Sequence, residues 1–320
     1  MTNIACVGAG YWGKNLIRNF NELGVLHTIC DGDEDVRASF ADQYPGVSTA
    51  EDLGQILAND EIVAVSIATP AEMHAWMIKA ALTAGKHVYV EKPLCLDEDE
   101  AQQCIALAAE KGLILMVGHL LWYHPMVLEI KRKIDAGELG KLRYLNSNRL
   151  NMGLLRAEEN VLWSFAPHDV SMILGIVGEE PHGFGGHGAS HLTLGIADQA
   201  LGLLEFSGGV KAHVYVSWLN PFKEQKFVIV GEKAMLVFDD TVEWDKKLAK
   251  YAHAVEWQGE RPIAIKAEPE YIKLPKQEPL KAECQHFIDC VASGDTPRTD
   301  GREGLRVLKV LNKLQQAIDA

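Results

Sequence analysis

Glycines near the start of the chain have the spacing needed to hold a phosphate. A short apolar strand, Ile4–Val7, is followed by the run GAGYWG, and a helix is expected over 14–23. In such a unit the first glycine makes the tight turn, the second lets the backbone approach a pyrophosphate, and the third lets the helix pack on the strand. The N–H groups and positive dipole end of the helix favour the diphosphate. The expected cofactor contacts are Gly8, Gly10, Tyr11, Trp12 and Gly13.

An acid at the end of the next strand indicates which dinucleotide binds. The strand Leu26–Cys30 ends at Asp31, which follows Gly10 at about the 20-residue spacing of the carboxylate that binds the adenosine ribose. A carboxylate there repels the 2′-phosphate of NADP, and the next arginine is Arg37. The pattern therefore predicts NAD. The alternative is an ordinary turn followed by a surface acid.

Polar residues also follow the other strands of this half. Strands are expected over 62–68, 87–90 and 113–117, and they end at Thr69-Pro70, Glu91-Lys92-Pro93 and Gly118-His119. In a doubly wound parallel sheet, ligands bind at the carboxyl ends of the strands. We therefore expect these residues to line one crevice with Asp31.

The chain is long enough for two domains. Residues 1–120 alternate strand and helix, which predicts a Rossmann-type α/β domain with a doubly wound parallel sheet that binds NAD. Residues 121–320 predict an α+β domain with an open, mostly antiparallel sheet for substrate binding and oligomerisation, and the last helices can pack back on the first domain. Apolar residues on both faces of 201–206 and 210–218 favour a homodimer or homotetramer formed through this sheet.

The composition of the chain limits the kinds of partner that the protein is expected to bind. The net charge of −13 argues against nucleic acid or an anionic membrane as a partner. No apolar run approaches the roughly 20 residues of a membrane span, and the six cysteines have no Cys-x-x-Cys pair, so buried thiols and a cytoplasmic location are expected. A segment rich in His and Gly, 182–191, lacks acidic or cysteine ligands. Its histidines are interpreted as loop residues, and no metal site is predicted.

The whole chain resembles the Gfo/Idh/MocA oxidoreductase family. The resemblance is carried by the glycine motif, by Thr69-Pro70-x-x-x-His74, by Glu91-Lys92-Pro93 and by Asp300-Gly301 before a leucine-rich helix. It implies a two-domain NAD-dependent sugar dehydrogenase. It also adds Thr69, Pro70, His74, Glu91 and Lys92 to the expected cofactor contacts.

Three stretches resemble the nucleotide-sugar branch of that family: 118–125, 146–149 and 162–169. Enzymes of this branch oxidise the 3-hydroxyl of a UDP-linked N-acetylhexosamine or its uronic acid. The resulting 3-keto sugar goes to a pyridoxal phosphate aminotransferase, for 3-amino sugars of envelope glycans such as lipopolysaccharide. The resemblance thus implies a UDP-sugar substrate.

Oxidation of a secondary alcohol needs a hydride acceptor and a base. Lys92, at a strand end, can donate a hydrogen bond to the reacting oxygen, and Pro93 suits a shaped turn. His168 matches the catalytic base of the family. The alternatives are that Lys92 is a solvated surface residue and that His168 only marks the start of a helix. Many relatives carry Asp four positions before this histidine, where the chain has Ser164. A proton relay through an acid at that position is therefore not expected in this protein.

Further contacts are expected from the second half. Trp163 is expected to shield the nicotinamide, and substrate contacts are expected from Lys92, Tyr123, His124, Asn148, Arg149 and His168. Arg149 suits a diphosphate and Tyr123 can stack on a sugar or base, but a structural ion pair and a core aromatic are equally consistent. Two other functions remain open. One is a dehydrogenase of a free sugar, an inositol or a cyclic imine, and the other is a non-catalytic NAD-binding sensor.

Overall fold

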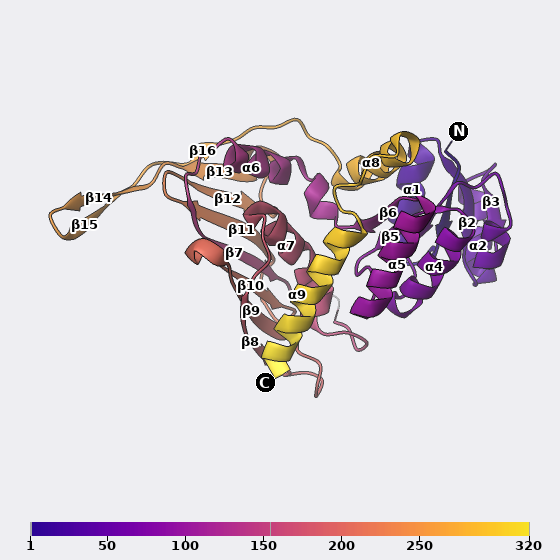
Figure 1. The fold of residues 1–320 in the computed structure, drawn as a ribbon, viewed down its shortest axis with the longest axis horizontal. Coiled ribbons are helices and arrows are strands. Elements are labelled where there is room, and N and C mark those ends of the chain that lie inside the picture. The colour runs from indigo at the N-terminus through magenta and orange to yellow at the C-terminus, as the bar shows by residue number, and fades with distance from the viewer. Residues whose placement is uncertain (1, 154, 320) are drawn as a thin grey trace. The chain divides into compact units, whose positions relative to one another are not determined.

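The computed structural model describes residues 2–153 and 155–319 (Figure 1). The chain forms two compact units. The first contains the residues up to Tyr123 together with Glu278–Leu308, and the second contains His124–Gln277 and the residues from Lys309 onward. The sequence placed the division between residues 120 and 121. In the structure, the segment Glu278–Leu308 returns to the first unit.

The first unit is built on a parallel sheet. Within the described residues its six strands have the order β3-β2-β1-β4-β5-β6, and every pair is parallel. The strands are β1 (Ile4–Val7), β2 (Leu26–Cys30), β3 (Ser48–Ala50), β4 (Ala64–Ile67), β5 (His87–Glu91) and β6 (Leu115–Gly118). This is the doubly wound order in which a dinucleotide binds where the strand order reverses, between β1 and β4. The predicted fold class is confirmed.

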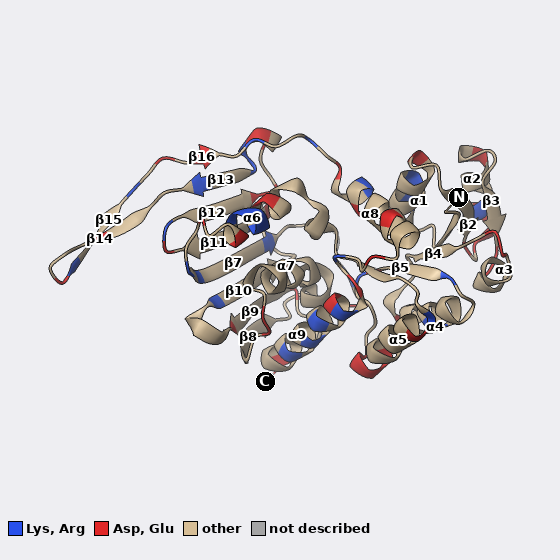
Figure 2. Ribbon diagram, turned by 45° about the horizontal axis from the view of Figure 1, so that its top comes forward, with Lys and Arg blue, Asp and Glu red and all other residues tan. Residues whose placement is uncertain are grey.

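Helices cover both faces of this sheet. They are α1 (Gly13–Glu22), α2 (Glu34–Gln43), α3 (Leu53–Leu57), α4 (His74–Thr83), α5 (Glu98–Lys111), α8 (Pro279–Ser293) and the start of α9 (Gly301–Asp319), with the 3₁₀ turns η1 (Ala71–Met73) and η2 (Leu120–Tyr123). Helix α1 packs with α8 on one face, and α4 packs with α5 on the other (Figure 2). Asp97 caps α5 by accepting from the N–H of Glu100, and acids fill its first turn, where they suit the helix dipole.

An aromatic cluster joins α1, β5 and α8. The side chains of Phe20, Tyr89 and Phe287 are buried, with 5.8 Å between the ring centres of Tyr89 and Phe287 and 6.5 Å between those of Phe20 and Phe287. Both pairs meet edge to face, an arrangement that favours aromatic contacts. This cluster attaches the returning helix α8 to the dinucleotide domain.

The second unit contains a mixed sheet. Within the described residues its eight strands have the order β16-β13-β12-β11-β7-β10-β9-β8, and only β7 and β10 pair in parallel. The strands are β7 (Leu142–Leu150), β8 (Gly183–Ala189), β9 (Gln199–Glu205), β10 (Lys211–Ser217), β11 (Glu224–Gly231), β12 (Met235–Asp239), β13 (Leu248–Tyr251) and β16 (Glu270–Tyr271). The 3₁₀ turns η3 (Ser207–Gly209) and η4 (Trp244–Lys246) lie in this unit.

One face of that sheet is covered by helices. Helix α7 (Val161–Val177) lies against β7, β9 and β10, and α6 (Pro125–Asp135) packs on α7 and β12 (Figure 1). The end of α9 covers β8 and β9, where a Cβ on Gly202 would stand 2.9 Å from the side chain of Leu314. The glycines of these strands thus let α9 approach closely.

Two segments differ from the sequence prediction. The interpretation of the three histidines in 182–191 as loop residues is wrong for His187, which lies in β8. His191 lies outside the strand, and its Nδ1 is 2.7 Å from Oδ1 of Asp198. The hairpin of β14 (Ala254–Gln258) and β15 (Arg261–Ile265) was not predicted. No helix among the described residues is long and apolar enough to cross a membrane.

The aromatic cluster gives the first prediction. Phe287→Ala removes a fully buried ring and should lower the free energy of unfolding by about 3–5 kcal/mol, because a cavity replaces the lost contacts. Chemical denaturation monitored by circular dichroism measures it. The control is Phe222→Ala, whose side chain is exposed and whose effect should stay within about 0.5 kcal/mol. Equal effects of the two changes would refute the role of the cluster.

Candidate active site

The dinucleotide loop has the geometry that its three glycines predict. Gly8 has a φ of +90°, and a Cβ there would lie 2.7 Å from the carbonyl oxygen of Ala68. A Cβ on Gly13 would lie 1.9 Å from the carbonyl oxygen of Gly8, so α1 packs on the turn. A Cβ on Gly10 would meet nothing within 4 Å. Gly8 and Gly13 are thus required by packing, whereas Gly10 leaves the backbone open to a ligand.

Asp31 lies at the end of β2 beside this loop. Its Oδ2 accepts from the N–H of Ala9 at 2.8 Å and its Oδ1 from that of Asp33 at 3.0 Å. A carboxylate accepts about four hydrogen bonds, so it retains capacity for the ribose hydroxyls. Nη1 of Arg37 donates to the main-chain oxygen of Asp31 at 2.8 Å. The guanidinium of Arg37 therefore lies beside the main chain of Asp31.

The turn Glu91-Lys92-Pro93 follows β5. Nε1 of Trp12 and the N–H of Lys92 both donate to the carboxylate of Glu91, and the Lys92–Pro93 peptide bond is cis. Lys92 is half-buried. The glycine loop and the Glu-Lys-Pro turn, far apart in sequence, are therefore joined through one carboxylate.

His74 joins the segments that follow β4 and β5. Its Nδ1 lies 2.7 Å from the carbonyl oxygen of Pro93 and its Nε2 lies 3.0 Å from that of Thr69. The side chain is buried, and burial lowers its pKa against the effect of the two carbonyls. Pro70 follows Thr69 and leads into η1. His74 is thus held inside the scaffold, where it positions the turn that carries Lys92.

Tyr123 and His124 are buried. The hydroxyl of Tyr123 lies 3.0 Å from Oγ1 of Thr299, and the guanidinium of Arg298 lies 5.1 Å from the ring centre. His124 caps α6 by accepting from the N–H of Met126. Burial lowers the pKa of His124 to about 4, so it is neutral at physiological pH. For Tyr123, the core-aromatic alternative agrees with these contacts.

Helix α7 carries the second group of predicted residues. Ser164 and His168 are half-buried and lie one turn apart on one face of the helix. The indole of Trp163 donates to Gln315 at 3.1 Å. Pro167 stands inside α7 and removes one N–H from the helical ladder directly before His168. Lys92 and His168 belong to different units, and their convergence on one hydroxyl stays a prediction.

Arg149 contacts a residue that the sequence prediction left out. Nε and Nη2 of Arg149 donate to the two carboxylate oxygens of Asp169, at 2.8 and 3.2 Å, and Oγ of Ser147 donates to the same carboxylate at 2.6 Å. Asp169 is buried beneath β7. The forked pairing agrees with the structural ion pair that the sequence left open.

Asn148 is separated from Arg149 by the alternation of the strand. Neighbours in a strand point to opposite faces, and Ser147 and Arg149 both meet Asp169 on the face covered by α7. Asn148 donates instead to Glu224 at 2.7 Å on the other face. The structure therefore does not bring Asn148 together with Arg149.

Two functional candidates were missed by sequence reasoning. Asp169 follows His168 directly and was not among the predicted site residues. Glu283 is fully buried in α8, among the buried residues Leu280, Cys284 and Phe287. The signal available in the sequence was an acid at a position with helical spacing from these apolar residues.

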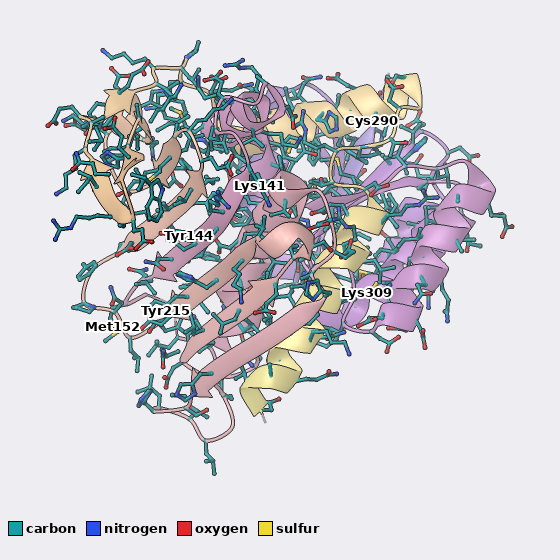
Figure 3. The ribbon with its side chains drawn as sticks, turned by 60° about the vertical axis from the view of Figure 1, so that its left-hand side comes forward. Lys141, Tyr144, Met152, Tyr215, Cys290 and Lys309 are labelled. Carbon is teal, nitrogen blue, oxygen red and sulfur yellow. The ribbon has the colours of Figure 1, made fainter. Side chains whose placement is uncertain are left out.

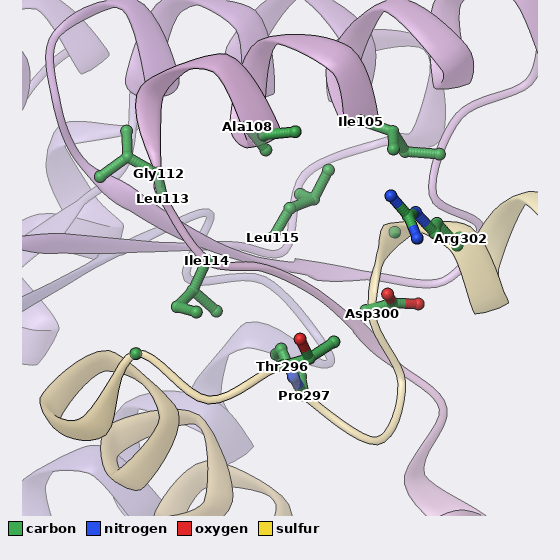
Figure 4. Close-up of a pocket in the computed structure, with 13 residues that line it drawn as sticks. Ile105, Ala108, Gly112, Leu113, Ile114, Leu115, Thr296, Pro297, Asp300 and Arg302 are labelled. Atoms are coloured by element: carbon green, nitrogen blue, oxygen red, sulfur yellow. The ribbon is translucent and has the colours of Figure 1, made fainter.

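A cavity of the first unit lies away from these residues. About 300 Å³ in volume, it opens between α5, the start of β6 and the loop before α9 (Figure 4). Its lining includes Ile105, Ala108, Leu115, Pro297 and Arg302. It adjoins the amino end of β6, whereas the predicted cofactor contacts lie at the carboxyl ends. In the described part of the chain, its lining shares no residue with the predicted site.

The fold and the loop define the class of protein. A parallel sheet of Rossmann order, a glycine turn against α1 and an acid at the end of β2 make the first unit an NAD-binding domain of an oxidoreductase. A family profile described as "Oxidoreductase family, NAD-binding Rossmann fold" matches residues 2–119, and the "GFO/IDH/MocA C-terminal domain" matches residues 127–237. The chain belongs to the GFO/IDH/MocA family of oxidoreductases.

Relatives of full length lie within this family. A UDP-N-acetylglucosamine 3-dehydrogenase from Acidithiobacillus ferrooxidans is 27% identical over 98% of this chain and 96% of its own. A scyllo-inositol 2-dehydrogenase (NAD(+)) from Bacillus subtilis is 28% identical over 90% of this chain and 84% of its own. The solved structure of the Acidithiobacillus enzyme GnnA superposes with a TM-score of 0.86 at 26% identity, over 99% of this chain and 97% of that one.

The contacts of Asp31 give a prediction on cofactor choice. Asp31→Ser should weaken NADH binding about tenfold, because hydrogen bonds to the ribose are lost. It should strengthen NADPH binding, since the repelling carboxylate is removed beside Arg37. Fluorescence titration with each reduced cofactor measures both constants.

The control for this change is Asp33→Ser. Asp33 caps α2 through the N–H groups of Asp35 and Val36, and serine caps equally well. The control should therefore leave both constants close to those of the unaltered protein. An Asp31→Ser protein with an unaltered preference for NADH would contradict the assigned role.

Proposed function

We propose that the protein catalyses NAD-dependent oxidation of the 3-hydroxyl of a UDP-linked N-acetylhexosamine, with UDP-N-acetylglucosamine favoured, to the 3-keto sugar. The observation that carries the proposal is similarity over nearly the whole chain to a UDP-N-acetylglucosamine 3-dehydrogenase, in sequence and in fold. The 3-keto product suits a pyridoxal phosphate aminotransferase that makes 3-amino sugars for envelope glycans such as lipopolysaccharide. A cytoplasmic location fits such a route.

The residues of the Glu-Lys-Pro turn supply the donor for the reaction. NAD, when bound, accepts the hydride from the carbon that carries the hydroxyl. Nζ of Lys92 donates a hydrogen bond to the hydroxyl oxygen and stabilises the negative charge that develops there. Glu91 and His74 hold the backbone on either side of Lys92, through the N–H of Lys92 and the carbonyl of Pro93. A fixed ammonium is effective because it needs no reorganisation during the reaction.

His168 takes the proton of the hydroxyl. A half-buried imidazole on a rigid helix can hold that proton near neutral pH and release it to solvent. Ser164, one turn earlier on the same face, stands where many relatives carry Asp, so His168 acts without a carboxylate at that position. The alcohol thus loses the proton of its hydroxyl to His168 and a hydride from its carbon to NAD, which together make up the two-electron oxidation to a ketone.

Substrate contacts remain proposals with different support. Lys92 and His168 act on the sugar directly. Arg149 uses two of its nitrogens on Asp169, so its contribution to a diphosphate comes from its remaining N–H groups. Trp163 is proposed to cover the nicotinamide. The contacts of Tyr123, His124 and Asn148 favour a structural role for these residues over direct recognition of the substrate.

A second function within the family is supported by one comparison. Similarity to scyllo-inositol 2-dehydrogenase is as high as that to the UDP-sugar enzyme, at 28% identity. An inositol or free sugar needs no diphosphate contact, so a protein that oxidises inositol and ignores UDP-sugars would establish this alternative. A non-catalytic NAD-binding sensor would show tight NADH binding and no turnover with any of them.

The uncovered face of the second sheet is proposed to pair subunits into a dimer or tetramer. Tyr144 and Leu203 are exposed there, and Figure 3 shows Tyr144 and Tyr215 on this face. Val228 pairs with Val237 in the middle of the same face. Apolar side chains gathered on an uncovered sheet are typical of a subunit interface.

Lys92 gives the central test of activity. Lys92→Ala should lower kcat with UDP-N-acetylglucosamine by about 10²–10³ because one donor to the developing oxyanion is lost, while the dissociation constant of NADH stays near that of the unaltered protein. Reduced cofactor is followed by absorbance, with a carbonyl-trapping reagent to draw the reaction forward. The control is Lys111→Ala, an exposed lysine at the end of α5. Unaltered turnover in Lys92→Ala would remove the assigned role.

The sheet face gives a separate prediction. Val228→Lys introduces a charge in the middle of the proposed interface and should shift the protein to monomers, because a buried charge without a partner is costly. Light scattering coupled to size-exclusion chromatography measures the mass. Val255→Lys on the exposed hairpin β14–β15 is the control. An unaltered mass for Val228→Lys would move the interface elsewhere.

A further inference from the structure

The hydroxyl of Tyr89 stands between two carboxyl groups. It lies 3.1 Å from Oε1 of Glu91, in the Glu-Lys-Pro turn, and 3.1 Å from Oε2 of Glu283, in α8. Tyr89 and Glu283 are both fully buried, and Tyr89 also joins the aromatic cluster with Phe287. A chain of three polar groups therefore runs from the buried side of α8 to the cofactor-binding edge of the sheet.

The protons of this chain can be assigned by counting donors. A phenol has one O–H and can donate to only one of the two carboxyl groups. Burial raises the pKa of Glu91, but Glu91 accepts from Trp12 and from the N–H of Lys92, and these donors favour its ionised form. Oε1 of Glu283 is buried and has no hydrogen-bond partner within the described residues. An ionised group with one oxygen unpaired inside the core is strongly disfavoured, whereas a neutral acid leaves only a carbonyl oxygen there.

The surroundings of Glu283 favour the neutral form. Among the described residues, the ionisable groups that face it are Tyr89, Glu91, Tyr123, Cys284 and Glu303, and none of them is basic. Glu303 is itself paired with His119. Burial, followed by the charge of Glu91, raises the pKa of Glu283 well above its usual value. At the hydroxyl of Tyr89, burial is the largest cause that raises the pKa well above its usual value, so the hydroxyl keeps its proton.

We propose that Glu283 is a positioning residue of the NAD site: as a neutral carboxylic acid it donates through Oε2 to the hydroxyl of Tyr89, which donates to Glu91. Each hydrogen bond in the series Glu283–Tyr89–Glu91 then has a fixed donor and a fixed acceptor. Glu91 is thereby held where it accepts from Trp12 of the glycine loop and from the backbone of Lys92. The effect on NADH binding rests on the Rossmann domain alone, and only the effect on turnover rests on the proposed function.

Gly118 supports this assignment from the neighbouring strand. A Cβ at Gly118 would lie 2.7 Å from the hydroxyl oxygen of Tyr89 and 3.0 Å from each carboxylate oxygen of Glu91. The end of β6 therefore leaves room for the Tyr89–Glu91 contact only because residue 118 has no side chain. Gly118→Ala provides a second way to disturb the chain without altering any of its ionisable groups.

The first test compares two replacements of Glu283 in the full-length protein. Glu283→Gln retains a donor toward Tyr89 and should keep the dissociation constant of NADH close to that of the unaltered protein. Glu283→Leu has no donor, and Tyr89→Phe breaks the link. Each of these two should weaken NADH binding about tenfold, the effect of losing one buried hydrogen bond. Gly118→Ala should weaken it as well. Circular dichroism and denaturation confirm that each variant is folded.

The second test separates a neutral acid from an ionised one. A group whose folded pKa lies above its unfolded pKa stabilises the fold less as pH rises from the unfolded value toward the folded one. The unfolding free energy of Glu283→Gln should therefore rise relative to the unaltered protein between about pH 4.3, the usual pKa of a glutamate, and pH 8. Infrared difference spectra should also show a protonated carboxylic acid band that Glu283→Gln lacks.

The outcomes distinguish this proposal from the proposed function. A Glu283→Gln protein that binds NADH as poorly as Glu283→Leu, or a stability difference that falls with pH, would show that Glu283 is ionised and would overturn the proposal. Neither measurement uses a sugar. Failure to oxidise UDP-sugars would therefore count against the proposed function and leave this result standing.

Discussion

The carboxylate of Glu91 is the contact on which the arrangement of the site depends. It joins the indole of Trp12 in the glycine loop, the backbone N–H of Lys92 and the hydroxyl of Tyr89. Trp12 lies in the turn after β1, whereas Tyr89 and Lys92 lie in β5 and in the turn that follows it. The two segments are distant in sequence. One acceptor thus fixes the position of the glycine loop relative to Lys92, the residue proposed to act on the substrate.

Close packing imposes a second constraint on the same edge of the sheet. Gly8 approaches the carbonyl of Ala68, and Gly118 lies against Tyr89 and Glu91. At both positions a side chain would displace backbone or a buried polar group. Helix α8, attached by Phe287, brings a carboxyl group beneath this edge from a segment at the far end of the chain. The first unit includes Glu278–Leu308, a segment that follows most of the second unit in the sequence.

The features predicted successfully from sequence are those set by backbone geometry. Glycine spacing, the acid after β2 and the strand–helix alternation identify the fold and the cofactor, because these signals are local. The directions in which side chains point were harder to predict. Adjacent residues of a strand face opposite ways, so Asn148 and Arg149 cannot share a pocket on one face. The burial of Tyr123 and the pairing of Arg149 with Asp169 depend on partners from distant segments, which no local pattern reveals.

The central claim is that Lys92 and His168 act on one hydroxyl beside the nicotinamide. The most direct measurement is a crystal structure of the protein with NADH and UDP-N-acetylglucosamine. The account predicts that Nζ of Lys92 and a ring nitrogen of His168 both lie at about 3 Å from the 3-hydroxyl oxygen. Two side chains on opposite sides of the sugar, or too far apart to reach the same oxygen, would contradict it.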